Sequence, residues 1–142
     1  MTKLRLLLLF PILSALVVGL TTTSFAAKFD PQTMMDVNEV QRGDRAVGRT
    51  VFAGTEISEF RLEIIDIMSR ANLGSDMILA RVLDGPVVAR QSGIIGGMSG
   101  SPVYINGRLI GAVAWGWGFQ KEPITGITPI RSMLQAFDSM DA

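Results

Sequence analysis

GGMSGSPVYINGRLIGAVAWG, residues 96–116, decides the fold class of this 142-residue chain. Its second half holds two apolar runs separated by Asn106-Gly107, a dipeptide that suits a two-residue type I′ turn because both positions need positive φ. The stretch therefore predicts a β-hairpin. In its first half Ser99 stands between glycines, which is typical either of an exposed nucleophile or of a tight loop that leads into the hairpin.

Short β-strands are also predicted on both sides of this hairpin. Four segments have the β-branched content or the apolar-polar alternation of strands: residues 47–54, 59–68, 76–83 and 123–130. A helix over residues 57–69 is the alternative for the second segment, and Asp84-Gly85-Pro86 is a turn signal after the third. Residues 131–140 have the apolar spacing of a short terminal helix. This pattern predicts a small β-barrel or sandwich.

The N-terminus has the pattern of a secretory signal. Lys3 and Arg5 precede an apolar run over residues 6–20, and small residues follow up to Ala26. We expect cleavage after Ala26 and export to the periplasm or the extracellular space. An uncleaved signal would instead tether the protein to the membrane, although the apolar run is short for a membrane span.

The expected organisation is a signal peptide over residues 1–26, a polar lead-in segment over 27–47 and a single domain over 48–142. The lead-in segment contains a predicted turn at Arg42-Gly43-Asp44.

Composition excludes several classes of function. The chain has 13 basic and 13 acidic residues, and this balance gives no indication of a nucleic-acid partner, which would favour an excess of basic residues. It has no cysteine and no histidine, which excludes disulfides and makes zinc sites of the usual kind unexpected. We therefore expect no metal and no cofactor.

The Ser99 loop has the residue types that a serine nucleophile needs. The N–H groups of Gly97 and Ser99 are candidate donors to an oxyanion, and Gly100 permits the sharp exit of the chain. The spacing G-x-S-G-x-P matches the nucleophile loop of trypsin-like enzymes and differs from the G-x-S-x-G elbow of α/β-hydrolases.

Residues 92–130, together with residues 47–68, resemble the SpoIVB peptidase family, serine peptidases of the trypsin-like fold from spore-forming and other bacteria. The similarity covers about residues 34–134 and is carried by Gly-Met-Ser-Gly-Ser-Pro followed by Asn-Gly-Arg-Leu-Ile-Gly-Ala-Val. It implies a mostly β fold: a trypsin-like β-barrel, one barrel or half of a two-barrel enzyme, with a short C-terminal helix.

The resemblance also implies site residues. Ser99 matches the family nucleophile, and Asp84, 15 residues earlier (99 − 84), matches the acid of the triad, although a simple turn explains an aspartate there equally well. Gly97 and Ser99 would form the oxyanion hole. Three aromatic residues fall where the substrate groove is expected, with core and rim packing as the alternative: Trp115, Trp117 and Phe119.

Two positions depart from trypsin-like patterns. Met98 stands where many such enzymes carry an aspartate that captures the new N-terminus on activation, so we expect no such switch. The family's catalytic base is a histidine, and this sequence has none. Lys121 is a conceivable base, but its neighbour Glu122 would keep it charged.

The expected function is an exported SpoIVB-like serine endopeptidase domain that uses an acyl-enzyme mechanism and is incomplete or inactive as given. Its partners would be a peptide or protein substrate and a complementary segment that bears the histidine. The alternative is a catalytically dead exported module that binds peptides or signals. A membrane-tethered structural protein is a third class, if the signal is not cleaved.

Overall fold

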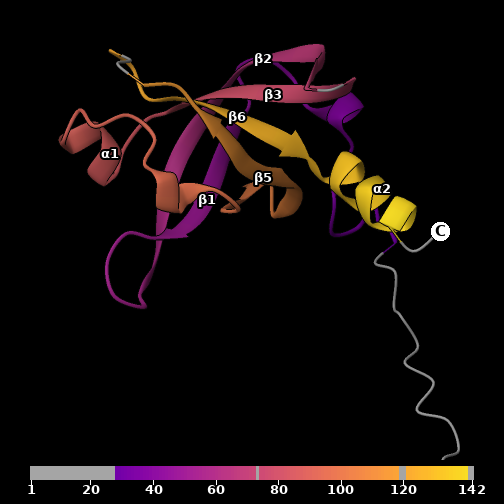
Figure 1. Ribbon diagram of the computed structural model, residues 1–142, viewed down its shortest axis with the longest axis horizontal. Helices are drawn as coiled ribbons and strands as arrows, with labels where there is room; N and C mark the ends of the chain where they lie inside the picture. Colours follow the sequence, from indigo (N-terminus) through magenta and orange to yellow (C-terminus); the bar gives the residue numbers. More distant parts are fainter. Residues whose placement is uncertain (1–27, 73, 119–120, 141–142) are drawn as a thin grey trace, which may run out of the picture.

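The computed structural model describes residues 28–72, 74–118 and 121–140. They form six antiparallel strands that close into a barrel in the order β1-β2-β3-β6-β5-β4, followed by a C-terminal helix (Figure 1). The strands are β1 (Arg45–Val51), β2 (Ile57–Asn72), β3 (Ser75–Val82), β4 (Pro102–Ile105), β5 (Arg108–Gly116) and β6 (Ile124–Pro129). The short helices are η1 (Val37–Glu39), α1 (Pro86–Ala89) and η2 (Gly96–Met98), and the C-terminal helix is α2 (Ile130–Met140).

This architecture confirms the predicted mostly β fold with a trypsin-like barrel and a short C-terminal helix. Asn106 and Gly107 join β4 to β5 with φ of 50° and 79°, as the type I′ turn requires. The alternative helix over residues 57–69 is wrong, because β2 occupies this segment. Closure gives each of the described strands a neighbour on both sides, since β1 pairs with β4 through Val47 and Gly48.

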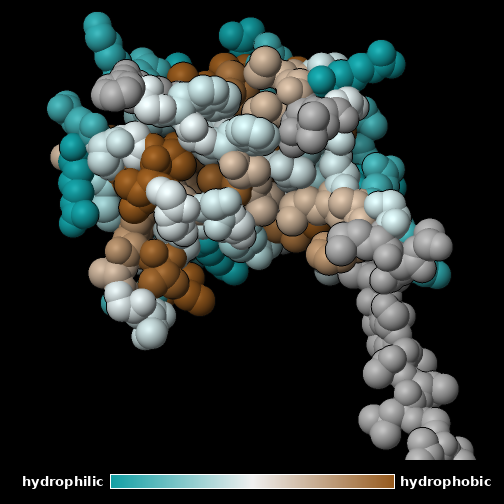
Figure 2. Space-filling view, in the orientation of Figure 1, coloured by the Kyte–Doolittle hydropathy of each residue, from teal (hydrophilic) through white to brown (hydrophobic). Residues whose placement is uncertain are grey.

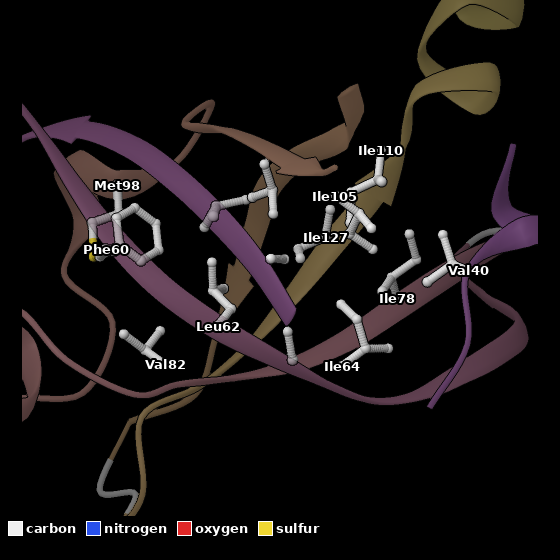
Figure 3. Packing of buried hydrophobic residues seen from close by; sticks show 14 of the residues in the cluster. Val40, Phe60, Leu62, Ile64, Ile78, Val82, Met98, Ile105, Ile110 and Ile127 are labelled. Carbon is white, nitrogen blue, oxygen red and sulfur yellow. The ribbon is translucent and has the colours of Figure 1, made fainter. Parts of the chain in front are cut away.

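The barrel interior is filled by the apolar residues that alternate along the strands. Leu62, Ile78, Ile110 and Ile127 are fully buried there, and Figure 3 shows them as members of one packed cluster. Burial of such side chains is the main term that stabilises a domain of this size.

The lead-in segment packs against the barrel instead of standing apart from it. Met35 and Val40 are buried in the core, and the Met35 N–H donates to the carbonyl of Leu109 at the start of β5. Gly43 has a φ of 89°, as the predicted turn at residues 42–44 requires. The first strand begins at Arg45, three residues before the expected start of the domain.

Helix α2 covers one end of the barrel. Ile130 and Leu134 are buried, and the Arg131 guanidinium lies 3.9 Å from the centre of the Phe29 ring while it pairs with Asp36. Figure 1 shows α2 and α1 at opposite ends of the barrel, so the lead-in segment and α2 are held together at one end. No helix among the described residues is long and apolar enough to cross a membrane.

Candidate functional site

Ser99 projects from a loop that is anchored by the residue before it. The Met98 side chain is buried in the core beside Phe60 (Figure 3), and Met98 ends the single turn of η2. Ser99 then adopts extended backbone with φ of −58° and ψ of 133°, and its side chain is exposed. Gly100 follows with φ of 85°, a conformation that side chains rarely adopt. An inward anchor followed by an extended residue explains why Ser99 is exposed to solvent.

Ser101 has a different environment, because its hydroxyl is buried. It donates to the Thr50 hydroxyl in β1 over 2.8 Å, and both residues are 7% exposed. The main chain at this point is tied to β5, since the Gly100 N–H donates to the Val113 carbonyl at 2.7 Å and the Val113 N–H donates to the Ser101 carbonyl at 2.9 Å. Ser101 therefore holds the loop on the barrel and leaves Ser99 as the accessible serine. The sequence offered no sign that Thr50 would be its partner.

A pocket of about 150 Å³ opens beside Ser99. Its remaining walls come from residues 94–96, which lead into η2, and from residues 113–116 of β5. None of these wall residues carries a charged side chain. The Ile94 side chain packs directly over Gly116, where a Cβ would lie only 2.8 Å from that of Ile94. The pocket can therefore accept an uncharged side chain of limited size.

Of the two predicted groove aromatics that the structure describes, Trp115 lines this pocket, and it is 43% exposed. The Thr125 hydroxyl donates to its carbonyl at 2.7 Å and so fixes the strand behind it. Trp117 is equally exposed just after β5. Phe119 lies outside the described residues. The sequence analysis did not predict that Ile94 and Ile95 line this pocket. Their position as an apolar pair directly before Gly96 and Gly97 could have indicated it.

The last residues of β5 have one unpaired edge. Residues 115–116 pair with β6 through Gly126 and Thr125, while on the other side β4 begins only at Pro102, opposite Ala112. Past Val113, no described strand continues that side of β5. An extended peptide can add to this edge by main-chain hydrogen bonds and thereby reach Ser99.

The two candidate oxyanion donors do not both point at the pocket. The Ser99 N–H donates to the Gly96 carbonyl at 3.3 Å. Across the described residues, the Gly97 N–H has no hydrogen-bond acceptor. Gly97 and Ser99 are thus close in the chain, but only one of these two N–H groups is free.

Asp84 is held by Arg61 at the end of β3. Its carboxylate accepts from the Arg61 backbone N–H at 2.7 Å and from the Arg61 Nε at 2.5 Å. Burial alone raises the pKa of the Asp84 carboxyl, but the hydrogen bonds and the charge of Arg61 outweigh it and lower the pKa below its ordinary value. Within the described segments, no hydrogen bond links Asp84 to the Ser99 loop. Its role as the triad acid stays a prediction.

Lys121 lies at a separate pocket lined by residues such as Val87 and Gln91, and it does not line the pocket of Ser99. The Glu122 carboxylate forms an ion pair with Arg81 at 2.7 Å, and not with its neighbour Lys121 as the sequence suggested. No group of metal-ligating side chains occurs among residues 28–72, 74–118 and 121–140.

The sequence was also compared with known protein families. The sequence matches the family described as SpoIVB peptidase S55 over residues 17–134. No curated protein matches it.

Proposed function

The chain belongs to the SpoIVB peptidase S55 family, and we propose that it is an exported serine endopeptidase domain in which Ser99 is the nucleophile. The position of Ser99 carries this proposal. Ser99 is exposed where a pocket with uncharged walls meets the unpaired edge of β5. A serine peptidase needs these three features together, since the edge orients the substrate and the pocket sets which bond reaches the nucleophile.

The substrates are peptides or proteins, and we propose that they bind as a strand along residues 114–116. The side chain before the scissile bond would then enter the pocket beside Ser99. Because Ile94 crowds Gly116 and the walls carry no charge, the favoured side chain is apolar and small, such as alanine or valine. Burying a charged side chain among these walls without a partner would be costly.

The proposed chemistry is acyl transfer. The Ser99 Oγ attacks the substrate carbonyl carbon while a base removes its proton, and the N–H groups of Ser99 and Gly97 stabilise the oxyanion that forms. The C–N bond then breaks as the base returns the proton to the leaving amine. Water next attacks the acyl ester, giving its proton to the same base, and releases the acid and the Ser99 hydroxyl.

A histidine in a complementary segment is the proposed base, because these 142 residues contain none. The turn end of the β1–β2 hairpin supports a docking place for it. Val51 and Ile57 pair with each other there and are 45% and 70% exposed, and Val51 directly follows Thr50, whose hydroxyl accepts a hydrogen bond from Ser101. Figure 2 shows apolar surface over this hairpin. An apolar surface of this kind next to the nucleophile fits a segment that completes the site.

An exported module that binds peptides without cleaving them is the second candidate. What favours it is that Asp84 is paired with Arg61 and Lys121 lines another pocket, so among the described residues neither has a hydrogen bond to Ser99. Binding needs only the edge of β5 and the pocket. This candidate predicts peptide affinity that is unaffected by Ser99→Ala.

Peptidyl diphenyl phosphonates test the proposal, since they modify serine nucleophiles according to the side chain that enters the specificity pocket. We expect slow modification of Ser99, detected by mass spectrometry. A probe with valine next to the phosphonate should modify it faster than an otherwise identical probe with lysine. Modification of other serines at the same rate, or a preference for lysine, would contradict the proposed site.

A further inference from the structure

The peptide group between Gly96 and Gly97 lies in front of the Ser99 N–H. Its carbonyl accepts that N–H at 3.3 Å. In a trans peptide the C=O and the N–H point in opposite directions, so the Gly97 N–H faces away from the region toward which Ser99 donates. The two donors required for an oxyanion hole therefore do not converge in this structure.

The turn around this peptide has a second form with the same ends. Ile95 to Met98 is closed by the Met98 N–H donating to the Ile95 carbonyl at 2.9 Å, and the helical turn η2 gives its centre the geometry of a type I turn. Rotating the central peptide by about 180° converts type I into type II and keeps the closing hydrogen bond. The rotation removes the Gly96 carbonyl from Ser99 and brings the Gly97 N–H to the same side.

We propose that the Gly96–Gly97 peptide is an autoinhibitory gate, closed in this structure, whose rotation forms the oxyanion hole. This inference rests on the proposed function of Ser99. A bound carbonyl that develops negative charge interacts favourably with two N–H groups and unfavourably with the Gly96 carbonyl oxygen. The substrate thus has different affinities for the two forms and shifts the equilibrium to the open one.

The residue types at the two central positions fit this gate. A type II turn needs positive φ at its third residue, which is Gly97, while its second residue, Gly96, keeps ordinary angles. Neither glycine has positive φ in the closed form, and a Cβ on either would meet no atom within 4 Å. Packing in the closed form therefore gives no reason for glycine at 97. The positive φ of the open form does give one.

The surroundings keep the rotation local. On one side Met98 is buried in the core, and on the other the Gly100 N–H donates to Val113 at 2.7 Å. Both anchors lie outside the rotating peptide. The nucleophile and the strand edge therefore remain in place when the gate opens.

Amide hydrogen exchange of the full chain tests the gate directly, with Gly97→Ala as the test variant and Gly96→Ala as its matched control. Alanine at 97 is compatible with the closed turn and disfavours the open one, while alanine at 96 suits both. We expect unchanged or slightly raised melting temperatures for both variants. The Ser99 amide should exchange about tenfold more slowly in Gly97→Ala than in wild type or Gly96→Ala.

A peptide boronic acid with valine next to the boron gives the second readout, because its adduct with Ser99 mimics the oxyanion. Gly97→Ala should weaken its binding on the order of 100-fold, the effect of losing an oxyanion donor. Equal Ser99 exchange in all three proteins, or unweakened boronate binding by Gly97→Ala, would overturn the gate. Slowed exchange in Gly97→Ala together with no boronate binding to wild type supports the gate and refutes the peptidase site.

Discussion

Ser99 and Ser101 stand two positions apart and have opposite environments. Met98 is pulled into the core, Ser99 extends outward, and the positive φ of Gly100 turns the chain so that the Ser101 hydroxyl meets Thr50. The spacing of the glycines was enough to predict Ser99 as the exposed serine, since it follows from local backbone geometry. The partner of Ser101 could not be predicted, because it lies 51 positions away in the chain.

Gly100→Val should destabilise the protein by about 1–3 kcal/mol, because a β-branched residue is strained at a φ of 85°. Space is not the cause, since a Cβ at this position meets nothing within 4 Å. Gly118→Val is the matched control, as Gly118 is equally open and has no positive φ, and it should change stability by less than about 0.5 kcal/mol. Chemical denaturation measures both. Equal losses would show that the backbone angle is not the source.

Asp84 shows what a local motif leaves out. Asp84-Gly85-Pro86 correctly predicted the end of β3, whereas the helix α1 that begins at Pro86 was not predicted. The ion pair with Arg61 depends instead on the pairing of β2 with β3, which places residues 23 positions apart beside each other. No short pattern in the sequence specifies that register.

The Arg61 contact makes stability depend on pH in a defined direction. The folded protein holds the pKa of Asp84 below its ordinary value of 3.8, so the ionised carboxylate contributes stability that is fully present above that value and lost as pH falls through the lower folded pKa. Asp84→Asn should cost up to about 1 kcal/mol at neutral pH, because the pair is partly exposed. The difference in melting temperature from wild type should shrink below about pH 4. A constant difference from neutral to acidic pH would contradict this reading.

At the scale of elements, β2 combines a predictable pattern with a break in it. The alternation of Phe60, Leu62 and Ile64 predicted the strand and its buried face, and all three are buried. An irregularity between Ile64 and Asp66 then shifts the register, so that Ile67 packs against the core three positions after Ile64. A β-bulge of this kind inserts one residue and cannot be told from the alternation alone.

The contact between β1 and the Ser99 loop is a buried hydrogen bond whose strength a double-mutant cycle can measure. Thr50→Val leaves the Ser101 hydroxyl buried without its acceptor and should cost about 1–3 kcal/mol. Adding Ser101→Ala removes the unpaired group. The double variant should therefore be more stable than the sum of the single losses predicts, by at least about 0.5 kcal/mol. Strict additivity in thermal or chemical denaturation would show that this hydrogen bond does not couple the two elements.

At the scale of the whole molecule, the barrel brings together residues from its beginning and its end. β1 pairs with β4, and the lead-in segment contacts α2 through Asp36 and Arg131. The number and type of strands could be predicted from composition and periodicity. Closure as a barrel instead of a sandwich could not be predicted from those features, because it depends on the pairing of strands far apart in the sequence.

Export is a prediction about the same whole chain. The basic start and short apolar run predict cleavage after Ala26, so the mature protein should begin at Ala27 outside the cytoplasm. Mass spectrometry of the exported protein measures the terminus. An intact Met1 in the membrane fraction would contradict cleavage.

The most direct test of the central claim, that Ser99 is a serine nucleophile lacking its base, is labelling of the full chain with a fluorophosphonate in the presence and absence of added imidazole. The oxyanion hole alone supports only slow attack, while imidazole has the chemistry of the absent histidine side chain. We predict slow labelling of Ser99 that imidazole accelerates, abolished by Ser99→Ala and largely retained by folded Ser101→Ala. Labelling that survives Ser99→Ala, or fast labelling without imidazole, would contradict the account.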